Sequence, residues 1–97
     1  MILVVNKRKY SGSSIYIGRP SPLGNPYVIG EHGTRDEVIA KYEVWLRKEY
    51  LTNSYVIAAV NKLIALNAAG GDVALCCWCA PAKCHGDVIK KFVEELS

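Results

Sequence analysis

The sequence has no apolar stretch long enough to cross a membrane, so no membrane partner is expected. Its N-terminal apolar run, residues 2–5, is too short for the core of a signal peptide. These absences predict a cytoplasmic protein, in which the four cysteines are reduced and act as ligands or reactive thiols rather than as disulfides. Internal repeats, linkers and low-complexity segments are also missing. With 97 residues, 51% of them hydrophobic, the chain suits a single α/β domain over residues 1–97.

Strong charge of either sign is missing too. The formal net charge is +3, which is too small to indicate nucleic-acid binding by itself. Part of the excess lies in Lys7, Arg8 and Lys9, at the end of a predicted strand, where lysine commonly blocks unwanted edge pairing. Nucleic acid is therefore a weakly supported partner. A chain this short also leaves much of its surface exposed, and a homodimer would cover part of it.

Hydrophobic periodicity predicts six elements in the order β-β-α-α-β-α. They are strands at 2–5 and 15–17, helices from 34 to about 51 and from 53 or 54 to 69, a strand at 73–79 and a helix after 84. The first two strands could pair as a hairpin. The last strand is continuously apolar, which is typical of a buried central strand. We predict a small sandwich of two or three layers around a short mixed or parallel sheet.

A cysteine–histidine segment, Cys76-Cys77-Trp78-Cys79-Ala80-Pro81-Ala82-Lys83-Cys84-His85-Gly86-Asp87, is the strongest functional signal. Unpaired N–H groups at a helix start favour bound anions and lower the pKa of a thiol. Cys84 is therefore a candidate nucleophile and His85 a candidate acid–base group. Asp87 would orient that histidine or complement the helix dipole. Cys76 is expected to lie in the core.

Two other interpretations of this segment stay open. Cys77, Cys79, Cys84 and His85 could bind zinc, which prefers tetrahedral sulfur and nitrogen ligands. The spacing lacks a Cys-x2-Cys pair, and adjacent ligands at positions 84 and 85 are geometrically awkward. Alternatively, the cysteines are small core residues with no chemistry. The sequence leaves undecided whether the chain is an enzyme, and zinc is the cofactor that it suggests.

Residues 18–33 form a long irregular segment with three prolines and four glycines, which no regular element tolerates. Within it, Arg19 offers a planar fork for a phosphate or carboxylate, and the backbone at Gly24-Asn25 could present N–H groups. The glycine spacing matches neither a Walker loop nor a dinucleotide fingerprint. Ligands of α/β folds bind at the carboxyl ends of strands, and both unusual segments follow such ends.

We therefore expect a pocket between the loop at Arg19–Pro26 and the loop and helix start at Cys79–Asp87. A nucleotide or another phosphorylated small molecule would be its ligand, with Trp78 stacking on a base or sugar. The expected ligand-binding residues are Arg19, Ser21, Gly24, Asn25, Trp78 and Cys79, and the catalytic candidates are Cys84, His85 and Asp87.

Three motifs together carry a family resemblance. They are Tyr16-Ile17-Gly18-Arg19-Pro20-Ser21-Pro22-Leu23-Gly24-Asn25-Pro26, the helix from Glu37 to Leu46, and Cys77-Trp78-Cys79-Ala80-Pro81 with Cys84-His85-Gly86-Asp87. From Tyr16 onward the chain resembles the uncharacterised family catalogued as domain of unknown function 4326, which occurs in phages, archaeal viruses and bacteria. The resemblance implies no activity. It implies one compact unit and a viral or mobile-element setting, and hence a location in the host cytoplasm. A viral accessory protein that binds a host protein is therefore a further alternative.

Overall fold

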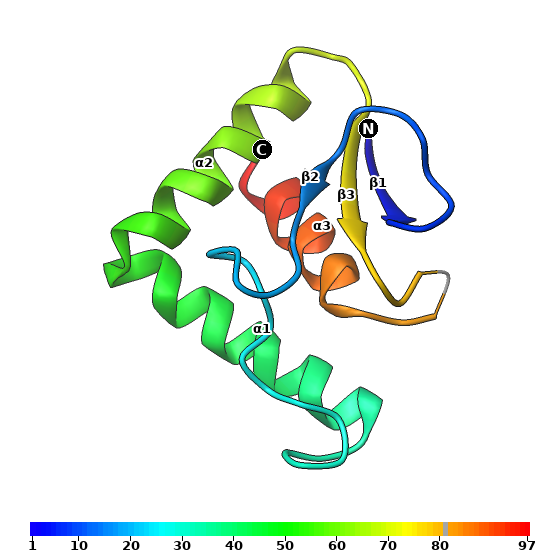
Figure 1. Ribbon diagram of the computed structural model, residues 1–97. Coiled ribbons are helices and arrows are strands. Elements are labelled where there is room, and N and C mark those ends of the chain that lie inside the picture. Colours follow the sequence, from blue (N-terminus) through cyan, green and yellow to red (C-terminus); the bar gives the residue numbers. More distant parts are fainter. Residues whose placement is uncertain (81) are drawn as a thin grey trace.

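The computed structural model describes residues 1–80 and 82–97, and Figure 1 shows three helices beside a small sheet. The elements are β1 (Ile2–Asn6), β2 (Ile15–Tyr16), α1 (Arg35–Thr52), α2 (Ser54–Ala68), β3 (Val73–Cys77) and α3 (His85–Leu96). The predicted α/β class and the order β-β-α-α-β-α are confirmed. Within the described part of the chain, every helix is too short or too polar to cross a membrane.

The sheet has the strand order β1-β3-β2, and both outer strands run parallel to β3. A parallel sheet was one of the two predicted types, whereas the hairpin between the first two strands is wrong. β3 is apolar at every position and all five of its residues are buried, so the central place gives it the most burial. β1 and β2 pair with opposite edges of this strand and cannot pair with each other.

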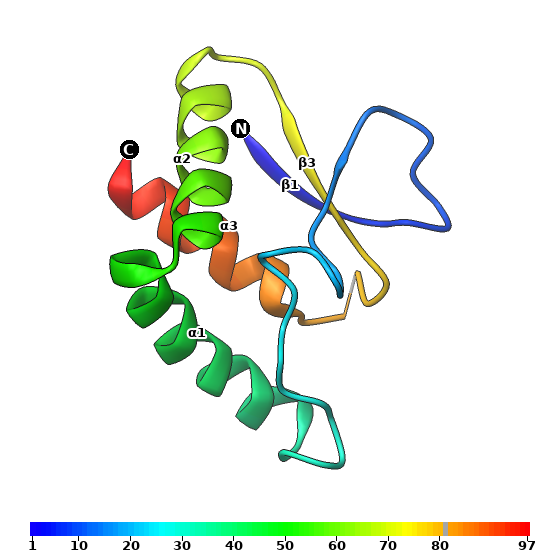
Figure 2. The same cartoon turned by 60° about the vertical axis from the view of Figure 1, so that its left-hand side comes forward.

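One face of the sheet carries the core. Ile2 and Val4 of β1, Ile15 of β2, and Val73 and Leu75 of β3 all pack into the main hydrophobic cluster. The register places Ile2 beside Val73 and both Val4 and Ile15 beside Leu75, so these side chains share one face. Figure 2 shows all three helices on the same side of the sheet. The fold is therefore the two-layer form of the predicted sandwich.

Local sequence signals determine where the helices begin. At α1, the Thr34 side chain accepts from the Glu37 N–H and the Glu37 carboxylate accepts from the Thr34 N–H, which is the predicted capping box. Asn53 separates α1 from α2: its N–H donates to the Glu49 carbonyl, and its side chain caps the start of α2. Tyr42 of α1 is fully buried in the core between the helices and the loop that follows β2.

The third strand is shorter than predicted, because a side chain of β1 forms hydrogen bonds with the backbone that follows it. β3 ends at Cys77, and the Asn6 amide donates to the carbonyls of Trp78, at 3.2 Å, and Ala80, at 2.9 Å. The chain therefore turns away from the sheet after Cys77. Trp78 and Cys79 lie in the loop, where their side chains can face a ligand.

Candidate functional site

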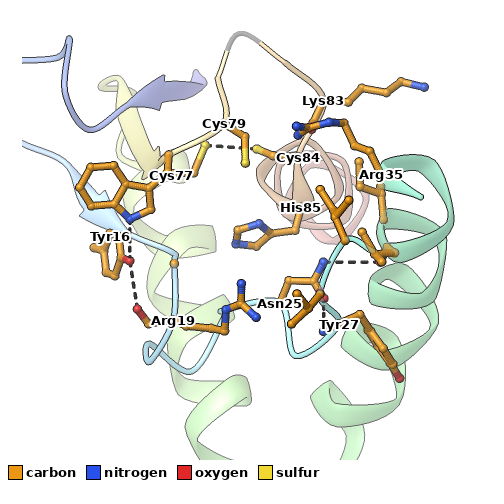
Figure 3. A pocket seen from close by; sticks show the side chains of 16 residues that line it. Tyr16, Arg19, Asn25, Tyr27, Arg35, Cys77, Cys79, Lys83, Cys84 and His85 are labelled. Carbon is orange, nitrogen blue, oxygen red and sulfur yellow. Dashed lines mark hydrogen bonds between the residues drawn. The ribbon is translucent and has the colours of Figure 1, made fainter. Parts of the chain in front are cut away.

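A cavity of about 460 Å³ lies at the carboxyl ends of β2 and β3, between the two loops that the sequence singled out. Figure 3 shows its walls, which come from the β2 end, the segment after it, α1 and the start of α3. It is lined by Tyr16, Gly18, Arg19, Asn25, Tyr27, Val28, Ile29, Arg35, Val38, Ile39, Cys77, Trp78, Cys79, Lys83, Cys84 and His85. The two unusual segments thus meet at one place in the fold, as expected from the ends of parallel strands.

Most of the predicted site residues line this cavity. They are Arg19, Asn25, Trp78, Cys79, Cys84 and His85, together with Cys77 from the alternative zinc set. Ser21, Gly24 and Asp87 do not line it. Cys76 is buried, with 3% of its surface exposed, as predicted for a core residue.

Gly24 has a packing role in the loop. Its N–H donates to the Ser21 carbonyl at 2.9 Å, so this N–H is not available to a ligand as predicted. A Cβ at Gly24 would lie 3.0 Å from the backbone N and Cα of Arg19, so only glycine lets the two segments approach this closely. Ser21 likewise turns inward, because its hydroxyl oxygen is buried and has no hydrogen-bond partner among the described residues.

Two contacts anchor this loop to α1. The Tyr42 hydroxyl donates to the Leu23 carbonyl at 2.6 Å in a buried environment. The Asn25 side chain accepts from the Tyr27 N–H at 2.9 Å and donates to the Val38 carbonyl at 3.5 Å. Both the oxygen and the nitrogen of the Asn25 side chain thus form hydrogen bonds within the protein. This residue therefore holds the cavity wall in place and has few hydrogen bonds left for a ligand.

Cys84 is the N-cap of α3. Its thiol sulfur accepts from the Gly86 N–H at 3.3 Å, and the Asp87 carboxylate accepts from the Cys84 N–H at 3.1 Å. This is a capping box in which cysteine takes the place of serine or threonine. A Cβ at Gly86 would lie 2.8 Å from Cγ1 of Val4, so glycine lets the helix start pack directly onto β1. The Cys-His-Gly-Asp motif therefore has a structural role, because its cysteine and aspartate cap the start of α3.

The thiol of Cys84 is protonated at neutral pH. Burial, and to a smaller extent the contact of its sulfur with the Cys77 sulfur at 3.2 Å, raise its pKa to about 12. The expected lowering of this pKa by the helix start is wrong here, because the loss of hydration outweighs the favourable Gly86 N–H. A nucleophilic thiolate is therefore not preformed at this position.

His85 is held in one tautomer. Its Nε2 lies 2.6 Å from the Ile17 carbonyl oxygen, which can only accept, so Nε2 carries the proton and Nδ1 keeps a lone pair. Burial lowers the His85 pKa, and the nearby Arg19 charge adds to this effect. The ring also packs edge-on against Tyr42, with centroids 5.1 Å apart. The Ile17 carbonyl thus orients the imidazole, in place of the Asp87 carboxylate that the sequence suggested.

An aromatic wall closes one side of the cavity. The Trp78 indole N–H donates to the Tyr16 hydroxyl at 3.1 Å, and this hydroxyl donates to the Arg19 carbonyl at 3.0 Å. The Tyr16 ring folds over Gly18, where any Cβ would collide with its hydroxyl. Trp78 nevertheless keeps 50% of its surface exposed. Its indole is therefore fixed in orientation and still open to a partner.

Residues 5–95 match the family described as "Domain of unknown function (DUF4326)". The chain belongs to the DUF4326 family. The match extends over nearly the whole chain and includes both walls of the cavity, so the earlier resemblance is confirmed. No curated protein and no solved structure is significantly similar to this DUF4326 chain.

The cavity of this DUF4326 chain is cationic. Arg19, Arg35 and Lys83 line it, and none of the described lining residues carries a carboxylate. Figure 3 shows the Arg19 side chain reaching toward His85, and the Arg35 guanidinium donates to the Lys83 carbonyl at 2.8 Å. The Lys83 ammonium lies 3.6 Å from Asp36, but both groups are largely exposed, so this pair is weak.

The sequence interpretation missed Tyr16, Arg35 and Lys83 as site residues. Arg35 is the first residue of α1, and Lys83 immediately precedes the N-cap of α3. A cation beside a helix start is disfavoured by the helix dipole. Two such placements in one chain were therefore a sequence signal for a cationic site near the two helix starts.

The described residues contain no group of three His, Cys, Asp or Glu side chains arranged to hold a metal ion. The predicted zinc set is therefore not assembled. Cys77 and Cys84 do meet, with sulfur atoms 3.2 Å apart, but His85 directs Nε2 to the Ile17 carbonyl.

Proposed function

We propose that this DUF4326 protein binds a nucleotide or another phosphorylated small molecule in the cavity between the Arg19 loop and the start of α3. The observation that carries the proposal is the lining: three cationic side chains, no carboxylate among the described lining residues, and an aromatic wall. A volume of about 460 Å³ also falls within the range of small-molecule sites, which is roughly 300–1,000 Å³.

Arg19 is the best placed group for the phosphate. Its guanidinium takes part in no ion pair within the described residues, and its side chain is exposed at the cavity. A free guanidinium can donate two parallel hydrogen bonds to phosphate oxygens. The starts of α1 and α3 also border the cavity and add positive potential from their helix dipoles.

The aromatic wall would take the uncharged part of the ligand. Trp78 and Tyr16 are joined by a hydrogen bond, so their rings are ordered before binding and lose little freedom on contact with a base or sugar. On the other side, Val28, Ile29, Val38 and Ile39 offer apolar surface. A nucleotide combines these two needs, because it has a flat ring at one end and phosphate at the other. The four free cysteines suit the reducing cytoplasm, where nucleotides are abundant.

A catalytic role would fall to His85. The fixed tautomer leaves Nδ1 as an acceptor, and the lowered pKa keeps the ring neutral at pH 7. A neutral imidazole beside a bound phosphate ester can accept a proton from a water or hydroxyl that attacks the phosphorus, while the ester P–O bond breaks and the leaving oxygen takes up a proton. Chromatography of nucleotides incubated with the protein tests this role. Turnover that His85→Gln abolishes, with binding retained, would support it, and turnover that survives the change would contradict it.

Isothermal titration calorimetry against a panel of nucleotides and inorganic phosphate tests the binding proposal. We expect saturable binding to the wild type and a loss of about 10- to 100-fold in affinity for Arg19→Ala, since hydrogen bonds to a charged group contribute about 1.5–3 kcal/mol. Arg19→Lys should fall between the two, because it keeps the charge and loses the fork.

Lys62→Ala is the matched control. Lys62 is exposed on α2 and does not line the cavity, so its removal changes the net charge equally and leaves the site intact. Equal losses for Lys62→Ala and Arg19→Ala would show a nonspecific charge effect. No heat from any member of the panel, with wild type and Arg19→Ala alike, would overturn the proposal.

A further inference from the structure

A basic segment lies directly against the outer face of the aromatic wall. The Lys7 N–H donates to the Cys77 carbonyl at 2.8 Å, which continues the pairing of β1 with β3 beyond the strand end. The Asn6 side chain accepts from the Arg8 N–H at 2.9 Å while donating to the Trp78 and Ala80 carbonyls. One asparagine therefore fixes the basic segment and the Trp78 loop to each other.

The cations of this segment lie over the rings that border the cavity. The Lys7 ammonium is 5.1 Å from the Tyr16 ring centre and 5.9 Å from that of Trp78. The Arg8 guanidinium is 5.5 Å from the Trp78 ring centre. Two cations and a half-exposed indole thus form one group beside the cavity, which we call the rim and define as Lys7, Arg8 and Trp78.

The positive charge of the rim and of the cavity is largely unpaired among the described residues, and the exception is the weak, exposed pair of Lys83 with Asp36. Among the described residues, neither Lys7 nor Arg8 forms an ion pair, and the same holds for Arg19 inside. Arg35 and Lys83 extend the positive lining to the far wall. Although the formal net charge is only +3, these five cations therefore lie around one end of the sheet.

We infer that the natural ligand is a single-stranded nucleic acid, of which one unpaired nucleotide occupies the cavity with its base against the cavity side of the Tyr16 and Trp78 wall, while the adjoining nucleotide places its phosphates beside Lys7 and Arg8. This inference rests on the proposed function, because the cavity must accept a nucleotide. Single strands suit the rim because an exposed aromatic ring stacks on any unpaired base and interleaved cations follow the backbone. A duplex hides its base faces and could use only the charges.

Fluorescence anisotropy with end-labelled oligothymidylates of increasing length, competed by thymidine monophosphate, tests the inference. We expect oligonucleotides to bind at least about tenfold tighter than the mononucleotide, because the rim adds contacts that one nucleotide cannot reach. Trp78→Ala should weaken oligonucleotide binding by about tenfold or more, and Trp78→Phe by less, since phenylalanine still stacks.

The salt dependence separates the rim from the rest of the surface. For the double variant Lys7→Ala/Arg8→Ala, the slope of log affinity against log salt should become shallower by about 1.4, the value for two phosphate contacts on a single strand. The double variant Lys48→Ala/Lys62→Ala removes the same charge from exposed positions on α1 and α2, and its slope should match the wild type. Circular dichroism confirms that each variant is folded.

The outcomes are distinguishable. Mononucleotides and oligonucleotides that bind equally, with an unchanged slope in the rim variant, would overturn this inference and leave the cavity proposal standing. Oligonucleotide binding that needs the rim but is indifferent to Arg19→Ala would overturn the placement of a nucleotide in the cavity. Duplex or polyglutamate that binds as tightly as the single strand, without dependence on Trp78, would show simple polyanion binding and would also overturn the inference.

Discussion

The sheet has a cavity at each end, and the two differ in chemistry far more than in size. The cavity at the carboxyl ends of β2 and β3 has a volume of about 460 Å³, and the one near the start of β3 has about 440 Å³. The first is lined by three cations and a neutral histidine. The second is lined by small and apolar residues with one carboxylate, Asp72. Size alone would not separate them, whereas charge does.

The two ends also differ in how closely the backbone packs. At the carboxyl end, Gly18, Gly24 and Gly86 each lie where an added Cβ would meet a neighbour at 3.0 Å or less. At the other end, Gly70 and Gly71 have nothing within 4 Å of such a Cβ. The cationic cavity is therefore built on close approaches of loop, strand and helix, and the opposite end is an open turn. The carboxyl end should therefore tolerate fewer substitutions at its glycines than the opposite end.

The largest effect on stability is expected from Gly86→Val. The new side chain would collide with Val4 and Ile17 and would force the start of α3 away from the sheet. Overpacking of this kind costs about 3 kcal/mol of unfolding free energy, at the upper end of its usual range. Urea denaturation measures the loss. Gly71→Val is the matched change at the open end and should alter stability by less than about 0.5 kcal/mol; equal effects at both ends would contradict the comparison.

Tyr42→Phe should have the next largest effect. It removes the donor to the Leu23 carbonyl and leaves that buried oxygen unpaired, at a cost of about 1–2 kcal/mol. The loop that carries Arg19 would also lose an anchor, so nucleotide affinity should fall as well. Thermal unfolding and calorimetry measure the two quantities. Tyr55→Phe is the control, because Tyr55 is 76% exposed. A comparable loss of stability in this variant would show that the buried hydrogen bond of Tyr42 is not the cause of the effect.

A smaller effect is expected from acidification. The His85 pKa is lowered in the folded protein from its usual 6.5, so the unfolded chain takes up the proton more readily. Stability from this group is present above pH 6.5 and declines as the pH falls below it. The melting temperature should therefore drop modestly between about pH 7.5 and 5.5, where carboxylates stay ionised. His85→Gln should flatten the profile, and a drop of the same size in this variant would assign the effect elsewhere.

Much of the fold could be predicted because it follows from local signals. The capping box at Thr34 and Glu37, the cap at Asn53 and the apolar run at 73–77 each determine an element through neighbouring residues alone. The same apolar run predicted a central place for the third strand, and the sheet order β1-β3-β2 confirms it. The partner of residues 15–16 could not be predicted from local signals, because the turn at 11–14 was compatible with the hairpin that the structure does not form.

The position of the candidate cavity could be predicted, whereas the contacts of its residues could not. Parallel strand ends bring the Arg19 loop and the Cys84 helix start together, and this much follows from element order. The high pKa of Cys84 depends on burial against Cys77, and the His85 tautomer depends on a carbonyl 68 positions away in the sequence. Such contacts form only when the whole chain packs, so residue spacing could not have revealed them.

An NMR titration of the uniformly nitrogen-15-labelled protein with adenosine monophosphate observes both ends of the sheet in one sample and so tests which end binds the nucleotide. We expect the backbone signals of Gly18, Arg19, Lys83 and His85 to shift and saturate together, while those of Ser14, Asp72 and Ala74 stay in place. Saturating shifts confined to Ser14, Asp72 and Ala74, or no shifts at either end, would contradict this expectation.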